Sequence, residues 1–365
     1  MKHLSKCLAS LTLCLAAAVA SAQTIGPGGE SATPSASVVV GDDQVAAVKA
    51  ANYTAALLWH DQSDFVNAVT AGASDEFARL GIEVVAVTSA GFDAAKQRSD
   101  IETALAKEPS IILSLPLDPV TSAAAFEEAK EAGVSLTFLS NLPSGYEHPA
   151  DYAAIVTDDL FQMGKQAADV LAEAMGNEGT VGWIFHDATY YVTNQRDNAF
   201  KTTIESDYPN ISIVAEQGIS DPARAEDIAN AMLLKNPDLG GIYVTWAGPA
   251  EGVLAALRAN GNTTTRIVTL DLSEPIALDM VRGGNVVAIV ADEAYELGRA
   301  MAASAVLDLL GQDVPPFVVA PALTVTADNV VEGWKRSLNV DPPESVTSAN
   351  CSSPWRGALA ARPTP

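Results

Sequence analysis

The stretch FDAAKQRSDIETALAKEPSIILSL at residues 92–115 returns in altered form as SDPARAEDIANAMLLKNPDLGGIYVT at residues 220–245. Both copies contain an Asp-Ile pair, a Lys-x-Pro helix end and a following apolar strand, and the second copy has one inserted residue. Two such copies, spaced by about 130 residues, indicate two similar α/β lobes. A solenoid would need about three or more short repeats.

Apolar strand-like runs alternate with Ala-rich helical patterns around the first copy. The series begins with TAALLW (54–59), continues through a helical pattern (64–81) and IEVVAV (82–87), and ends with SIILSL (110–115). Such alternation is typical of βαβ units and a parallel sheet. The chain has 365 residues, of which 48% are hydrophobic, which exceeds what one core usually organises. We therefore predict an α/β fold of two lobes.

Both ends of the chain differ in composition from the middle. Residues 1–22 have a basic start, a Leu- and Ala-rich run and a small-residue site, which together predict a secretory signal peptide. The run is too short to span a bilayer, and no later stretch offers about 20 consecutive apolar residues. The mature chain is therefore expected to be soluble. Gly, Ser, Pro and Thr predict a flexible N-terminal segment over residues 23–50 and a disordered tail over residues 341–365.

Charge and cysteine content exclude several classes of partner. Loss of Lys2 and Lys6 with the signal leaves 19 basic against 45 acidic residues and changes the formal net charge from -24 to -26. Nucleic acid and anionic lipid are therefore poor partners. Cys7 and Cys14 also leave, so Cys351 is alone and no internal disulfide or thiolate metal cluster is expected.

The residues that directly follow each predicted strand are the first candidates for a ligand site. Open α/β sheets bind ligands outside the carboxyl ends of their strands, and in two lobes those ends can face one another across a cleft. The strand-end residues are Trp59, His60, Asp61, Pro116, Leu117, Asp118, Ser140, Asn141, Thr157, Asp158, His186, Asp187, Trp246 and Asp271.

The segment YYVTNQRDNAFK (190–201) contains three aromatic rings, three side-chain amides, an arginine and an aspartate. A guanidinium offers five fixed donors and an aromatic face packs on sugar C–H groups, so Arg196 with Tyr190 or Tyr191 can orient a polyhydroxylated ring. Asn194 can donate and accept at once, as a hydroxyl requires. The alternative is that Arg196 only solvates the start of the next helix.

Other strand-end residues have structural alternatives. Asp271 could cap the following helix, and one of Asp158 and Asp159 could cap the helix that begins near residue 160. Trp59 and Trp246 could belong to the core, or they could face each other at corresponding positions of the two lobes and sandwich a ligand.

Two histidines, His60 and His186, each follow a strand next to an aspartate. Metal ligation needs three or more converging ligands, which the spacing does not demonstrate, so hydrogen bonding in a polar cleft is the expected role. We expect no metal and no cofactor. The sequence lacks a Gly-x-Ser-x-Gly elbow and a His-Glu-x-x-His motif, so hydrolysis has no visible nucleophile or metal.

Eight stretches, in order over residues 50–335, resemble periplasmic substrate-binding proteins of the ribose-binding type, the receptors of sugar ABC importers. The stretches are AALLWHDQSDF, IILSLPLDP, LTFLSN, IVTDDLFQMGKQAADVL, TNQRDNAF, IYVTW, IVTLDLSEP and GGNVVAIVADEAYELGRAMA. The resemblance implies two Rossmann-like lobes of type I, joined by a three-crossing hinge with the ligand cleft between them, and no enzymatic activity. It implies an N-terminal lobe of residues 51–156 and 294–318, and a C-terminal lobe of residues 157–293 and 319–340.

The resemblance also assigns expected roles to single residues. Arg196 lies where the family has an arginine that grips sugar hydroxyls, and Asp271 where it has a carboxylate that accepts two hydroxyl hydrogens. Asp292 falls at a polar hinge position, and Phe65 at an aromatic ring of the first loop. Asn141 lies at a strand end often occupied by Arg.

Departures from the family pattern make the expected pocket more aromatic, with one guanidinium fewer. Trp246 stands where ribose-type receptors usually have Asn or Asp, Asn141 replaces the Arg, and Trp59 and His60 replace small residues. The resemblance therefore implies a sugar or sugar-like ligand, but it does not identify ribose. The candidate ligand-binding residues are Trp59, His60, Asp61, Phe65, Asp118, Asn141, Thr157, His186, Tyr190, Tyr191, Asn194, Arg196, Trp246, Asp271 and Asp292.

We therefore expect a monomeric periplasmic receptor that captures a small sugar or polyol by hinge closure. Its implied partners are an ABC permease with its ATPase subunits, with a chemoreceptor as a further candidate and no nucleic acid. One alternative is a binding protein for a polyol, nucleoside or aromatic solute. Another is a secreted hydrolase or isomerase that uses His60 or His186. A transcription regulator is disfavoured by the export signal and by the lack of a basic helix-turn-helix start.

Overall fold

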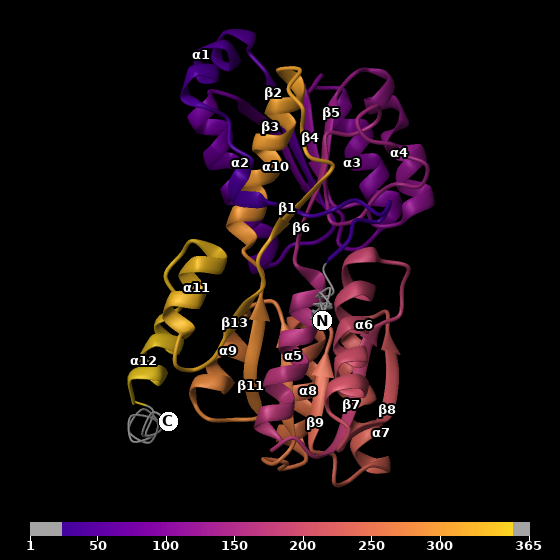
Figure 1. Ribbon diagram of the computed structural model, residues 1–365, viewed down its shortest axis with the longest axis vertical. Coiled ribbons are helices and arrows are strands. Elements are labelled where there is room, and N and C mark those ends of the chain that lie inside the picture. The colour runs from indigo at the N-terminus through magenta and orange to yellow at the C-terminus, as the bar shows by residue number, and fades with distance from the viewer. Residues whose placement is uncertain (1–23, 353–365) are drawn as a thin grey trace, which may run out of the picture.

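The computed structural model describes residues 24–352. The predicted signal peptide and the last part of the predicted tail, residues 353–365, lie outside the described residues. Figure 1 shows two α/β lobes stacked along the long axis of the molecule. The predicted fold of two lobes is confirmed.

The first lobe is built on a seven-stranded sheet in the order β1-β12-β6-β5-β4-β2-β3, in which all pairs are parallel. Its strands are β1 (Thr33–Pro34), β2 (Thr54–Trp59), β3 (Glu83–Ser89), β4 (Ile111–Ser114), β5 (Ser135–Leu139), β6 (Ala154–Asp158) and β12 (Phe317–Ala320). Its helices are α1 (Asp42–Ala51), α2 (Asp64–Leu80), α3 (Ala94–Leu105), α4 (Pro119–Glu131) and α10 (Ala294–Leu309), with the short 3₁₀ turn η1 (Ser35–Ser37). The helices cover the sheet, as buried apolar strands of a parallel sheet require.

The second lobe has a six-stranded sheet in the order β13-β11-β10-β9-β7-β8, with the short edge strand β13 antiparallel to β11. Its strands are β7 (Gly179–His186), β8 (Ile211–Ile219), β9 (Gly241–Val244), β10 (Arg266–Leu270), β11 (Val286–Ala291) and β13 (Leu323–Val325). Its helices are α5 (Leu160–Ala174), α6 (Tyr191–Asp207), α7 (Ala225–Lys235), α8 (Ala247–Ala259) and α9 (Glu274–Val281), with the 3₁₀ turn η2 (Pro222–Arg224). Two further helices, α11 (Val330–Leu338) and α12 (Glu344–Ser352), follow β13.

The chain passes between the sheets three times: after β6, after β11, and between β12 and β13. These strands end at Asp158, Ala291 and Ala320, close to the expected lobe boundaries at residues 156, 293 and 318. Two crossings are held together directly, because the Asp159 amide donates to the Ala320 carbonyl oxygen over 2.8 Å. Movement between the lobes therefore bends a few neighbouring residues.

Residues 24–50 correct the expectation of a flexible N-terminal segment. Two Arg299 N–H groups donate to the carbonyl oxygens of Ser35 and Val38 at 3.0 and 2.9 Å. Val48 is buried in the core, on a helix that the low-complexity composition did not indicate. The Thr24 hydroxyl donates to Asp159 over 2.6 Å, at the start of α5. The segment is ordered because its backbone groups and apolar side chains find partners in the folded lobes.

The predicted disordered tail also contains regular structure. Helix α12 packs against α9, and Val346 is fully buried. The prediction followed polar composition, whereas one apolar face of the helix is covered by the second lobe.

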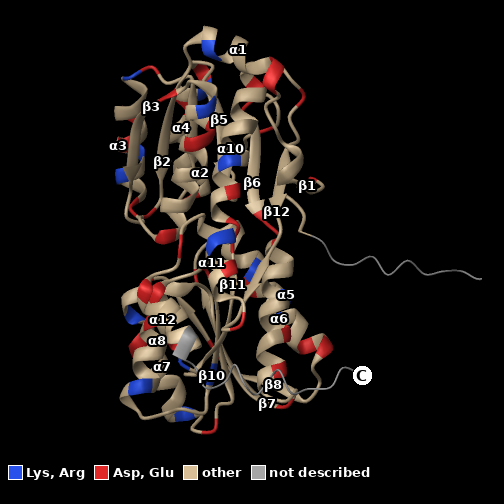
Figure 2. Cartoon of the chain, turned by 90° about the vertical axis from the view of Figure 1, so that its left-hand side faces the viewer, with Lys and Arg blue, Asp and Glu red and all other residues tan. Residues whose placement is uncertain are grey.

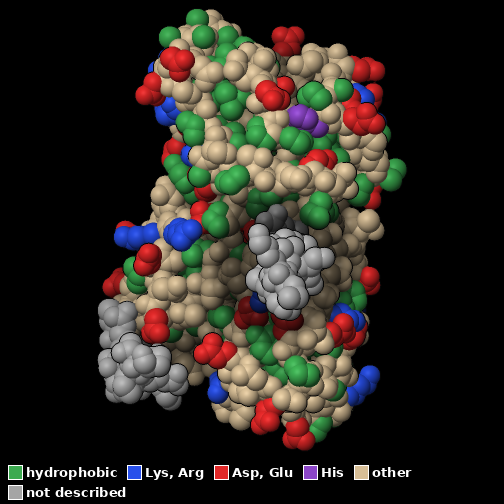
Figure 3. Space-filling model, in the orientation of Figure 1, with side chains coloured by type: hydrophobic (Ala, Val, Ile, Leu, Met, Phe, Trp, Pro, Cys, Tyr) green, Lys and Arg blue, Asp and Glu red, His purple; other side chains and the backbone are tan. Residues whose placement is uncertain are grey.

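Charge and apolar groups are spread over the surface. Figure 2 marks Asp and Glu residues on both lobes, in keeping with the negative net charge. On the face drawn in Figure 3, hydrophobic side chains are scattered over both lobes. Among the described residues, no helix has the length and apolar character needed to cross a bilayer.

Close packing of α2 against α10 depends on two glycines. A Cβ atom at Gly298 would lie 1.9 Å from the Val69 carbonyl oxygen, and one at Gly72 would lie 1.9 Å from the Tyr295 carbonyl oxygen. We expect Gly298→Ala to lower the free energy of unfolding by about 2 kcal/mol, because backbone on both helices must separate. Chemical denaturation measures the change. Ala71→Ser, at an exposed position of α2, is the control and is expected to change the free energy of unfolding by less than about 0.5 kcal/mol. A Gly298→Ala variant as stable as this control would contradict the packing argument.

Candidate ligand-binding site

A cavity of about 450 Å³ lies between the lobes, where the strands of both sheets end. Its N-terminal wall consists of the residues after β2, the start of α2 and the loop after β3. Its C-terminal wall consists of the residues after β7, β9 and β10 and the first turns of α6 and α8. The lining residues are His60, Asp61, Gln62, Ser63, Asp64, Phe65, Phe92, Leu115, Ser140, Asp158, His186, Tyr190, Val192, Thr193, Arg196, Trp246, Ala247, Gly248, Glu251, Asp271, Leu272, Ser273 and Asp292.

Arg196 is the buried cation of the cavity. Its side chain is 6% exposed, and Nη1 lies 3.2 Å from Oδ1 of Asp271 and 4.0 Å from Oδ1 of Asp292. Nη2 donates to the Thr245 carbonyl oxygen over 3.0 Å, while the buried Nε has no partner among the described residues. The alternative in which Arg196 only solvates a helix start is therefore wrong. A guanidinium held in this way has further N–H groups on Nη1 and Nη2, which suit recognition of a hydroxyl group.

Asp197, the next residue, has a structural role. It accepts hydrogen bonds from the His186 amide (2.8 Å), the Tyr243 hydroxyl (2.6 Å) and the Thr245 hydroxyl (3.0 Å). These bonds tie α6 to the ends of β7 and β9. Asp197 thereby fixes the turn of α6 from which Arg196 extends.

Three carboxyl groups, from Asp158, Asp271 and Asp292, lie around the Arg196 guanidinium, and burial raises the pKa values of Asp158 and Asp292. Burial raises the pKa of Asp158 to about 7, although the hydrogen bond to Asp292 and the Glu293 amide oppose this shift. Burial, followed by repulsion from Asp271, raises the pKa of Asp292 well above its usual value. Burial alone would lower the pKa of Arg196, but the carboxylates of Asp271 and Asp292 raise it. The raised pKa values of Asp158 and Asp292 favour the neutral form of a carboxyl group in this pair over two buried negative charges.

Both cavity histidines are neutral at neutral pH. Burial lowers the pKa of His60 to about 4, and burial together with the Arg196 charge lowers that of His186 to about 4. His186 Nδ1 lies 3.0 Å from the Thr193 hydroxyl, and its ring contacts the rings of Tyr190 and Trp246 at 5.0 and 4.9 Å. Among residues 24–352, no three His, Cys, Asp or Glu side chains are placed to hold a metal ion.

The first residues of α5 and α9 show which side chains cap these two helices. Asp159 caps α5 by accepting from the Gln162 amide at 3.2 Å, and Ser273 occupies the N-cap position of α9. Asp158 and Asp271 therefore both face the cavity. Asp271 has a φ of 64°, a left-handed conformation that costs a non-glycine residue energy and recurs at functional sites.

Nine of the fifteen candidate residues line the cavity: His60, Asp61, Phe65, His186, Tyr190, Arg196, Trp246, Asp271 and Asp292. Trp59 does not, because its side chain lies in the core of the first lobe and is 2% exposed. Of the two alternatives for Trp59, the core position is therefore the one that the structure shows, and the sandwich with Trp246 is wrong. The last residue of a buried strand can point to either face of the sheet, and here it points inward.

Five other candidates also lie outside the lining. Asp118 caps α4 by accepting from the Thr121 amide over 2.7 Å, and Thr157 lies 2.8 Å from the Ser140 hydroxyl. Tyr191 donates to the Ile25 carbonyl oxygen, and Asn194 does not reach the cavity. Asn141 joins the lobes: it donates to the Pro116 carbonyl oxygen over 3.0 Å and accepts from the Val192 amide over 3.3 Å.

The sequence matches the family model of the periplasmic binding protein domain over residues 55–313. This chain belongs to that family.

Two curated relatives of this periplasmic binding protein are sugar receptors by name. The D-apiose import binding protein of Actinobacillus succinogenes is 27% identical over 239 residues, which cover 65% of this chain and 75% of the relative. The D-allose-binding periplasmic protein of Escherichia coli is 26% identical over 233 residues, which cover 62% and 75%.

Solved structures share the fold of this periplasmic binding protein. A solute-binding protein of Agrobacterium vitis with bound α-D-tagatopyranose has a TM-score of 0.70 and 22% identity, and the match covers 77% of this chain and 96% of that one. A carbohydrate-binding protein of Agrobacterium radiobacter in complex with D-arabinose has a TM-score of 0.70 and 24% identity, with coverage of 79% and 99%. At these identities the likeness shows the fold.

Some lining residues of the binding protein were missed by the sequence argument. They are Gln62, Ser63, Asp64, Phe92, Leu115, Ser140, Asp158, Val192, Thr193, Ala247, Gly248, Glu251, Leu272 and Ser273; of these, Ser140 and Asp158 had been noted as strand-end residues. Most lie within a few residues of a strand end or in the first turn of a helix, where the same rule could have found them. Phe92 follows β3, a strand whose end was not considered.

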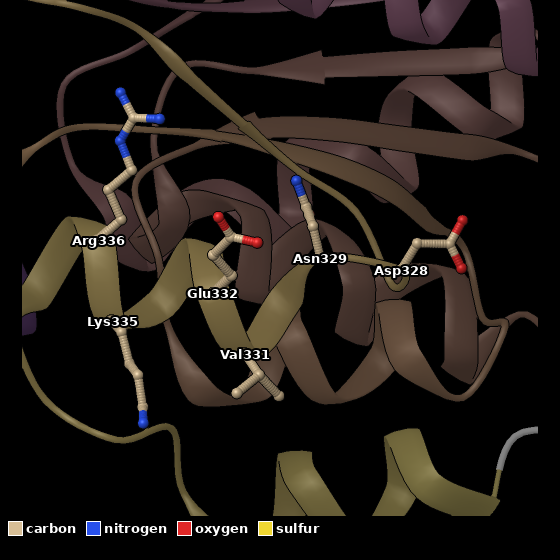
Figure 4. A pocket seen from close by; sticks show the side chains of 6 residues that line it. All are labelled: Asp328, Asn329, Val331, Glu332, Lys335 and Arg336. Carbon is tan, nitrogen blue, oxygen red and sulfur yellow. The ribbon is translucent and has the colours of Figure 1, made fainter.

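A second hollow, of about 620 Å³, lies along α11 and is not the candidate site. Its lining comes from one short segment, residues 328–336 (Figure 4). Lys335 pairs there with Asp341 at 2.6 Å, and Arg336 Nε donates to Glu293 over 2.7 Å. None of the strand-end residues lies in it.

Proposed function

We propose that this protein is the periplasmic solute receptor of an ABC importer and captures a small, uncharged sugar or sugar-like polyol between its lobes. The observation that supports it most directly is the Arg196–Asp271 pair, buried in a cavity that residues of both lobes line. A ligand that contacts both lobes stabilises only the closed form, which is the form a permease and its ATPase subunits would receive.

The electrostatics of the cavity favour an uncharged ligand over an anionic one. Six carboxyl groups line it, from Asp61, Asp64, Asp158, Glu251, Asp271 and Asp292, against the single guanidinium of Arg196. Both histidines are neutral, so no further cation offsets the carboxylates. An anionic solute would face like charges at low dielectric.

The ligand class is tested by thermal shift and titration calorimetry across pentoses, hexoses, polyols, nucleosides and uronic acids. We expect at least one neutral sugar or polyol to bind with a dissociation constant in about the micromolar range or below. The matching uronic acid is expected to bind at least about tenfold more weakly, because one repelling charge costs about 1.4 kcal/mol or more in a desolvated site. Preference for a nucleoside would select the alternative of a planar aromatic solute, and tighter binding of the uronate would contradict the charge argument.

Binding without chemistry is part of the proposal. Neither His60 nor His186 has a carboxylate placed to orient it for proton transfer: Nδ1 of His60 has no partner among the described residues, and that of His186 lies against Thr193. The bound solute is expected to be recovered unchanged after prolonged incubation. Appearance of a product by mass spectrometry would select the hydrolase or isomerase alternative.

A further inference from the structure

Phe92 is a large apolar residue that lines the cavity from the first lobe yet belongs to none of the hydrophobic clusters among the described residues. Its side chain is 46% exposed. The ring therefore adds little to the packing of the lobe that bears it. A structural account of Phe92 has to explain why an aromatic ring is held at this exposed place.

The backbone at Phe92 is strained. Its φ is 61°, in the left-handed region that a bulky side chain rarely enters, and it follows Gly91 with a φ of 60°. A hydrogen bond from the Phe92 amide to the His60 carbonyl oxygen, 2.8 Å long, fixes this conformation. Glycine would adopt this conformation at a lower energetic cost. The presence of phenylalanine despite that cost indicates that the phenyl ring itself has a role here.

The ring is also oriented. Phe92 and His60 meet edge to face, with ring centroids 5.5 Å apart and an interplanar angle of 77°. Because burial keeps the imidazole neutral, the contact is between two uncharged rings. This contact favours one orientation of the Phe92 ring at the wall of the cavity.

The second lobe offers the polar partner of the ligand. Arg196 and Asp271 lie on that wall, and the aromatic group of His186, Tyr190 and Trp246 lies beside them. A solute in this cavity therefore has the Arg196–Asp271 pair at the second lobe and, at the first lobe, the exposed Phe92 ring beside polar side chains such as Asp61 and Gln62. This arrangement fits a ring whose hydroxyl groups point to one edge and whose C–H groups form an apolar face.

We infer that Phe92 is a specificity-determining residue, a ring of the first lobe against which the apolar C–H face of the bound solute packs when the lobes close. It adds a second first-lobe ring to Phe65, which also lines the cavity. The inference rests on the proposed function, since it names the residue that reads one face of the same ligand.

The test separates a ligand contact from a structural role, because the two predict opposite changes in stability. Phe92→Gly removes both the ring and the strain. The variant is expected to bind the tightest solute of the neutral panel about tenfold more weakly, while its melting temperature without ligand stays equal to or above that of the parent. Phe92→Asn, which tolerates the left-handed conformation, is expected to show the same loss of affinity.

Val120→Ala is the matched control, since Val120 is an exposed apolar residue of the same lobe outside the cavity. Its affinity is expected to equal that of the parent. Parental affinity in Phe92→Gly, or a loss of affinity together with a marked fall in melting temperature, would overturn the role of Phe92 and leave the proposed function standing. A parent protein that binds no solute of the panel would overturn both.

Discussion

Arg196→Ala is expected to weaken sugar binding about a hundredfold while the two lobes still fold. A hydrogen bond from a charged donor contributes about 1.5–3 kcal/mol, and the loss of one or two such bonds to ligand hydroxyls corresponds to a factor of about 100. The fold is expected to persist because the buried carboxyl groups of Asp158 and Asp292 have raised pKa values and can be neutralised by protonation when the cation is removed. Arg196→Lys retains the charge but not the planar fork, so it is expected to lose about tenfold or more.

Arg258→Ala provides the control for this substitution. Arg258 also pairs with a buried aspartate of the second lobe, Asp279, at 2.9 Å, but it is 56% exposed and lies outside the cavity. Calorimetry is expected to show parental affinity for Arg258→Ala and circular dichroism a folded state for both variants. Parental affinity of a folded Arg196→Ala would remove this arginine from the site.

Asp158→Asn is expected to become more stable relative to the parent as the pH rises from 5 to 8. The pKa of Asp158 is about 7 in the folded protein against an ordinary value of 3.8, so the folded parent binds more protons than the unfolded chain between these values. The stability that Asp158 contributes to the parent is fully present below pH 3.8 and is lost as the pH rises through 7. Asparagine does not titrate and can still accept from the Glu293 amide. The difference in unfolding free energy is expected to shift by about 2 kcal/mol in favour of the variant.

Comparison of the two proteins cancels the groups that titrate alike in both, among them the two cavity histidines. Arg196, Asp271 and Asp292 face Asp158 and are present in both proteins. Because the Asp158 charge raises the pKa of Asp292, the difference reports the titration of the Asp158–Asp292 pair. His60 and His186 titrate with the opposite sign: their pKa values are depressed to about 4, so their stability is present above pH 6.5 and is lost as the pH falls through 4. Asp227→Asn, at a 75% exposed position, is the control and is expected to show a flat offset. A difference in unfolding free energy between Asp158→Asn and the parent that does not change with pH would contradict the raised pKa of Asp158.

The two lobes could be predicted from the sequence because the patterns that indicate their helices and strands extend over only a few neighbouring residues. The repeat at residues 92–115 and 220–245 corresponds to α3 with β4 and to α7 with β9. The strand-end rule led to seven lining residues, namely His60, Asp61, Ser140, Asp158, His186, Trp246 and Asp271. Arg196 was found from the polar segment at residues 190–201 and from the family resemblance. Period and composition along a few residues suffice for such elements.

What could not be predicted depends on contacts distant in sequence. The direction of the Trp59 side chain is set by core packing, and the order of the segment from Thr24 onward is set by Asp159 and Arg299, which follow more than 130 and 260 residues later. The polar composition of residues 24–50 does not indicate a contact with either of these two residues. The strained loop at Phe92 likewise becomes evident only from its backbone angle and its contact with His60.

Small-angle X-ray scattering with and without the tightest-binding neutral solute tests the central claim most directly. If the lobes close around a solute held by Arg196 and Asp271, saturation is expected to reduce the radius of gyration of the parent, and Arg196→Ala at the same solute concentration is expected to keep the ligand-free profile. Identical profiles of the parent with and without bound solute, under conditions where calorimetry shows full occupancy, would contradict it.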